Sequence, residues 1–125
     1  MLHKHKGFTL IELIVVMTIV SLLLTLAAPR YFRSIERSKE TVLKANLAAT
    51  RDALDKFYAD KGRYPDQLAE LVERHYLRTL PWDPIAESSD TWVIVPPAGG
   101  QPGGVYNISS GADGADANGV PYGEL

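Results

Sequence analysis

The fold is decided by the stretch Lys6-Gly7-Phe8-Thr9-Leu10-Ile11-Glu12 and by the apolar run that continues from it to Ala28. Residues 8–28 contain a single charged side chain, Glu12. As an α-helix these residues extend about 31 Å, which matches the roughly 30 Å hydrocarbon core of a bilayer. The sequence therefore predicts a membrane-spanning helix near the start of the chain.

The residues before this run set its orientation. Lys4 and Lys6, with His3 and His5 beside them, favour a cytoplasmic N-terminus and send the rest of the chain outward. A secretory signal peptide is the alternative, but the apolar run exceeds the usual 7–15 residues of such a segment. We therefore expect a single-pass anchor with its C-terminal part outside the cytoplasm.

Glu12 is the most informative residue of the run. A carboxylate inside an apolar helix costs roughly 2.5–3.5 kcal/mol at the bilayer centre, so it needs a partner or a shallow position. One interpretation is that Glu12 reaches the lipid headgroups from the cytoplasmic end. The other is that it pairs with a cation inside the membrane.

The rest of the chain predicts an α+β protein with four segments. Residues 1–7 precede the span, 8–28 cross the membrane, 29–61 continue as an amphipathic helix, and 62–125 form a head. Spacings of 3, 4 and 7 between apolar residues indicate the amphipathic helix, and Gly62 can end it in a left-handed conformation. In the head we expect a short helix after Pro65, strands over 91–95 and 104–109, and a weaker third strand near 119–122.

Composition excludes several classes of function. The chain contains no cysteine, which removes disulfides, thiol catalysis and iron–sulfur clusters. Residues 62–125 carry nine acidic and three basic side chains, so a nucleic-acid partner is not expected. His75 stands alone in the head, and no catalytic triad or phosphate-binding motif is visible, so we expect no enzyme.

The context of Glu12 resembles the type IV prepilin signature, a basic leader followed by Gly-Phe-Thr-Leu-Ile-Glu and a long apolar helix. The resemblance implies that a prepilin peptidase cuts between Gly7 and Phe8 and that the new Phe8 amine is methylated. It also implies that Glu12 pairs with the Phe8 amine, within one subunit or between neighbouring subunits, during assembly. Pro29 matches the family's position for a proline that loosens the helix, and we expect a kink there.

Motifs in the head narrow the resemblance to the major, G-type pseudopilins of type II secretion systems. These motifs are Gly62-Arg63-Tyr64-Pro65, Leu80-Pro81-Trp82-Asp83-Pro84 and Ser110-Gly111-Ala112-Asp113-Gly114. The resemblance implies a type IV pilin-like fold, with a long N-terminal helix packed on a small antiparallel sheet. It implies a structural subunit of the periplasmic pseudopilus that starts in the bacterial inner membrane with its head in the periplasm.

The partners implied in this way are copies of the chain in a helical filament, minor pseudopilins, the prepilin peptidase, the inner-membrane assembly platform and membrane lipid. Two alternative functions stay open. One is a subunit of a surface type IV pilus used for adhesion, motility or DNA uptake. The other is a membrane-anchored binding module that is never processed.

The C-terminal loop of G-type pseudopilins holds a calcium ion, and residues 109–118 here are rich in oxygen-bearing side chains and glycine. Carboxylates and carbonyls are the ligands that calcium prefers. Asp113 falls in the matching stretch, and Asp116 is the second candidate ligand because the usual acidic and tryptophan-containing end is missing. From the residues alone an Asp-Gly-rich loop is more often a turn than a metal site.

Overall fold

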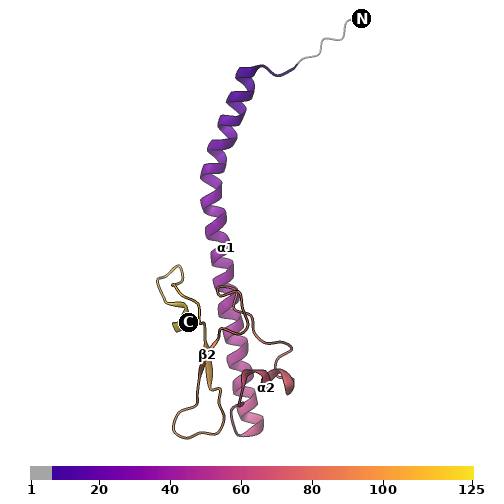
Figure 1. Cartoon of the computed structure of the whole chain (residues 1–125), viewed down its shortest axis with the longest axis vertical. Helices are drawn as coiled ribbons and strands as arrows, with labels where there is room; N and C mark the ends of the chain where they lie inside the picture. Colours follow the sequence, from indigo (N-terminus) through magenta and orange to yellow (C-terminus); the bar gives the residue numbers. More distant parts are fainter. Residues whose placement is uncertain (1–6) are drawn as a thin grey trace, which may run out of the picture. The chain divides into compact units, whose positions relative to one another are not determined.

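The computed structural model describes residues 7–125, and it shows an α+β chain whose predicted fold class is confirmed (Figure 1). Its elements are the helices α1 (Leu10–Lys61) and α2 (Leu68–Glu73), the strands β1 (Val93–Val95) and β2 (Asn107–Ser109), and the 3-10 helix η1 (Tyr122–Glu124). The chain divides into two compact units between Glu36 and Arg37.

The N-terminus of α1 is fixed by its first polar residues. The Thr9 carbonyl accepts the N–H of Leu13 at 3.1 Å, and the Thr9 hydroxyl accepts the N–H of Glu12 at 3.2 Å. Threonine followed three residues later by glutamate is the spacing of a capping box, in which the threonine side chain satisfies an N–H that the helix leaves unpaired. Thr9 is therefore the N-cap of α1.

In the first unit the apolar side chains of α1 are exposed. The large hydrophobic residues from Phe8 to Leu26 each keep between 45% and 87% of their surface accessible. The hydroxyls of Thr18, Ser21 and Thr25 donate to carbonyls four residues earlier, at 2.7, 2.7 and 2.8 Å. These three hydroxyls are thus paired within the helix, as a lipid environment requires. This segment is long and apolar enough to cross a membrane.

Pro29 lies inside α1, which continues through it without a break. A proline has no N–H, so the helical hydrogen bond to the carbonyl of Thr25 cannot form. The helix kink expected at Pro29 stays a prediction.

The core of the second unit is built on one face of α1. Leu43, Leu47, Leu54 and Phe57 are at most 1% exposed, and their spacing of 3, 4 and 7 residues places them on the same side of the helix. The residues of the head that pack against them are Leu71 of α2, Trp92, Val105 and Ile108. The predicted amphipathic helix is thereby confirmed.

Both helices of the second unit end with a residue in the left-handed region. Gly62 has φ of 69° and donates its N–H to the Tyr58 carbonyl at 2.8 Å, as predicted for the end of α1. His75 plays the same part after α2 with φ of 66°. Its N–H donates to Val72 at 3.2 Å, and the N–H of Tyr76 donates to the Leu71 carbonyl at 2.8 Å, which together form a Schellman motif.

The sheet is smaller than the sequence predicts. β1 and β2 pair in antiparallel fashion with Ile94 opposite Ile108. β2 begins at Asn107 instead of Gly104 because the N–H groups of Gly104 and Val105 both donate to the Pro65 carbonyl at 2.9 Å.

The expected third strand near 119–122 is wrong. An isolated bridge joins Ala115 and Pro121, and η1 follows it. The turn is closed by the Asp116 carboxylate, which accepts the N–H groups of Asn118 and Val120, so the backbone there does not extend along the sheet.

Candidate functional site

The expected processing site lies just before α1. Gly7 and Phe8 precede the first helical residue, both are exposed, and Phe8 keeps 87% of its surface accessible. The basic residues of the leader, Lys4 and Lys6, lie outside the described residues. An exposed, non-helical Gly7–Phe8 bond is the geometry that a peptidase needs, and cleavage there stays a prediction.

Glu12 is exposed at the start of α1 and its backbone N–H bonds to Thr9. Within residues 7–125 its carboxylate forms no ion pair and accepts no hydrogen bond, including any from Phe8. The described chain therefore leaves the charge of Glu12 without a partner. The sequence reasoning missed the cap by Thr9, although the Thr-x-x-Glu spacing was there to signal it.

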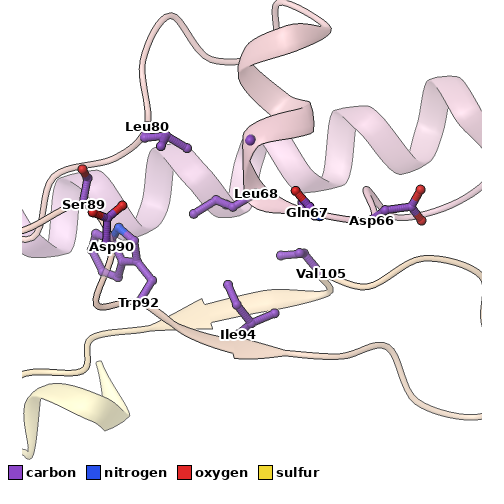
Figure 2. A pocket seen from close by; sticks show the side chains of 10 residues that line it. Asp66, Gln67, Leu68, Leu80, Ser89, Asp90, Trp92, Ile94 and Val105 are labelled. Carbon is purple, nitrogen blue, oxygen red and sulfur yellow. The ribbon is translucent and has the colours of Figure 1, made fainter.

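A groove lies between α2 and the sheet (Figure 2). It encloses about 320 Å³, and the side chains of Leu68, Ile94 and Val105 line its apolar part. Asp66 and Asp90 bring carboxylates to its margin. Among the residues that line the groove there is no histidine, lysine or arginine, and Asp66 pairs instead with Arg63, outside the groove, at 3.9 Å.

The proline-rich motif Leu80 to Pro84 is fixed through backbone carbonyls to α1 and to Trp92. Asn46 of α1 donates its side-chain amide to the Trp82 carbonyl at 2.6 Å. The indole of Trp92 donates to the Pro81 carbonyl at 2.8 Å. These bonds replace the backbone pairing that prolines prevent.

Asp83 is the buried centre of that motif, with no exposed surface. One carboxylate oxygen accepts the N–H groups of Ile85 and Ala86 at 2.9 and 3.1 Å. The other accepts the hydroxyl of Ser110 at 2.5 Å. Buried carboxylates require such donors, and this one ties the proline-rich motif to the C-terminal motif.

The Gly62–Pro65 turn is held by an ion pair. Arg63 donates to both carboxylate oxygens of Glu70, at 3.0 and 2.9 Å. These hydrogen bonds lower the pKa of Glu70 to about 2 from 4.5. Tyr64 is buried behind them, stacked on Tyr58 with ring centroids 4.6 Å apart.

The two candidate calcium ligands lie in different environments. Asp113 is exposed, whereas Asp116 is buried and accepts two backbone N–H groups at 2.9 Å. The N–H of Val120 is the main cause of a pKa of Asp116 below its usual range. Within the described chain no group of three or more His, Cys, Asp or Glu side chains is placed to hold a metal ion.

Residues 2–28 match the family model of the prokaryotic N-terminal methylation motif. The chain is 33% identical to type II secretion system core protein G of Klebsiella pneumoniae over 129 residues, which cover 90% of this chain and 89% of that protein. It belongs to the core protein G family of pseudopilins. The Escherichia coli K12 member is 30% identical over 89% of this pseudopilin and 84% of its own length.

A shorter match joins the pseudopilin to a pilin. The type IV major pilin protein PilA of Myxococcus xanthus is 38% identical over 68 residues, which cover 54% of this chain and 31% of PilA. No solved structure gives a significant match. The names of these relatives describe components of secretion systems and pili, in agreement with a structural subunit.

Proposed function

We propose that this pseudopilin is a structural subunit of the pseudopilus of a type II secretion system. In this proposal the chain enters the inner membrane with its N-terminus in the cytoplasm and its head in the periplasm. The prepilin peptidase cuts after Gly7 and the Phe8 amine is methylated. The mature chain then polymerises with copies of itself and with minor pseudopilins on the assembly platform. The match to a type II secretion system core protein G over 90% of the chain supports this role.

The observation that carries the proposal is the state of α1 in the first unit. Its apolar side chains from Leu10 to Leu26 are uncovered, and the Glu12 carboxylate has no partner within the described residues. In a bilayer, lipid covers the apolar surface but leaves the carboxylate uncompensated. In a filament, neighbouring helices cover the same surface and the methylated amine of another subunit neutralises Glu12.

The Thr9 cap allows a clean test of the Glu12 charge, because the cap does not use the Glu12 carboxylate. Glu12→Gln keeps a side chain that suits the third position of a capped helix, and the Thr9 cap uses the backbone N–H, so the helix start is preserved. Only the negative charge is lost. Glu36→Gln is the matched control, because Glu36 is also an exposed glutamate on α1 but lies outside the apolar run.

We expect Glu12→Gln to be cleaved and to accumulate in the membrane. The yield of sheared filaments should fall at least about ten-fold, because the Phe8 amine then lacks its partner and an unpaired charge in the membrane costs more than about 1.4 kcal/mol. Glu36→Gln should assemble like the wild type. Intact mass of the membrane protein reports cleavage and methylation in both variants. Filaments of Glu12→Gln at wild-type yield would contradict the proposed pairing.

The match to PilA favours one second candidate, a subunit of a surface type IV pilus. The two functions differ in what deletion of the gene abolishes. Loss of protein export with normal surface motility supports the pseudopilus, and loss of motility with normal export supports the surface pilus.

A further inference from the structure

Three charged side chains of α1 bind the segment from Gly114 to Leu125. Tyr122 donates its hydroxyl to Glu40 at 3.4 Å, and Arg51 donates to the Leu125 carbonyl at 2.6 Å. Between them, the ammonium of Lys44 lies 3.6 Å from the second carboxylate oxygen of Asp116. Spacings of four and seven residues put Glu40, Lys44 and Arg51 on one face of the helix.

Asp116 is the centre of this attachment. Its side chain is only 2% exposed, whereas that of Lys44 is 51% exposed, so the carboxylate lies inside the loop and the lysine reaches it from the surface. One oxygen closes the loop through the N–H groups of Asn118 and Val120. The backbone adds a bond of 2.8 Å from the Asp116 N–H to the Val120 carbonyl. A buried carboxylate in this position needs a nearby positive charge.

Calcium is the cation that the family resemblance implies here, and the residues present do not fit it. A calcium site supplies six to eight oxygen ligands at 2.3–2.6 Å. The groups that contact the Asp116 carboxylate are two N–H donors and an ammonium, which occupy its oxygens and repel a metal cation. Asp113, the other expected ligand, is exposed and precedes Gly114 in the sequence. The loop is thus built around a positive charge that the chain itself provides.

We propose that Lys44 is the internal cation of the C-terminal loop, neutralising Asp116 and fastening residues 114–121 to α1 in place of a bound metal ion. The folded head is then independent of calcium. This inference rests on contacts inside the second unit and stands whether or not the chain assembles into a pseudopilus.

The test uses the full chain in detergent micelles and follows thermal unfolding by the near-ultraviolet circular dichroism of its tryptophans. The wild type should melt at the same temperature in excess calcium and in excess EGTA. Lys44→Met should lower the melting temperature by about 4–8 °C in both buffers. Lys44→Arg, which keeps the charge, should retain most of the stability.

Lys39→Met is the matched control. Lys39 is also a lysine of α1 that pairs with a carboxylate of the head, that of Glu87 at 3.7 Å. Both side chains are well exposed, so loss of this pair should change the melting temperature little. Should Lys44→Met fail to fold, the double variant Lys44→Met/Asp116→Asn removes both charges and should regain a folded head. A higher melting temperature of the wild type in calcium would overturn the proposal, and so would equal effects of the two lysine variants.

Discussion

Replacement of Ser110 by alanine should destabilise the head strongly. The serine hydroxyl is the only donor to one oxygen of the Asp83 carboxylate within the described chain, at 2.5 Å, and Asp83 is completely buried. Ser110→Ala leaves that oxygen without a partner and without access to water. Losing a hydrogen bond to a buried charged group costs about 1.5–3 kcal/mol. The same hydroxyl also accepts the N–H of Ala112 at 3.1 Å, which places the expected loss at about 2 kcal/mol or more.

For a domain of this size, about 2 kcal/mol corresponds to a drop of roughly 8–15 °C in melting temperature. Thermal unfolding of the full chain in detergent measures it. Ser109→Ala is the control, since the neighbouring serine is partly exposed in β2 and is not among the described hydrogen-bond donors to the Asp83 carboxylate. Equal melting temperatures of the Ser110→Ala and Ser109→Ala proteins would refute the idea that this hydrogen bond anchors the proline-rich motif to the C-terminal motif.

Two further changes test other parts of the head. His75→Gly should raise the free energy of unfolding by about 0.5–1 kcal/mol in chemical denaturation, because a left-handed φ of 66° suits glycine better than histidine; a lower stability would contradict the Schellman assignment. The ion pair of Glu70 with Arg63 stabilises the fold when the carboxylate is charged. Because its pKa falls from 4.5 to about 2 on folding, this stability is present above about pH 4.5 and is lost as the pH falls toward 2. The stability advantage of the wild type over Glu70→Gln should therefore shrink over that range in acid titrations, and an advantage that is constant with pH would exclude the pair as its source.

Helices were well predicted from the sequence because their signals are local. The apolar period that leads to Leu47 and Phe57 and the glycine at Gly62 are sufficient to place the second half of α1 and its end. The sheet was less predictable, because the length of β2 depends on a distant partner. The Pro65 carbonyl captures the N–H groups of Gly104 and Val105, which residues 104–109 alone do not reveal.

Candidate functional residues likewise divide into those marked by a local motif and those that depend on distant contacts. Gly7, Phe8 and Glu12 were found from a contiguous motif, and the matched methylation motif covers them. The roles of Asp83 and Lys44 depend on contacts with residues 27 and 72 positions away along the chain, and nothing in the local sequence marks them. Asp116 was singled out for its chemistry, but its neighbours are N–H donors and a lysine, which only the tertiary structure shows.

The division of the chain between Glu36 and Arg37 has a mechanical consequence. The core of the head begins at Leu43, and no residue of the apolar run contributes to it. A pulling force that draws the run out of lipid therefore removes no side chain from that core. The anchor can therefore carry a mechanical load while the core of the head stays intact.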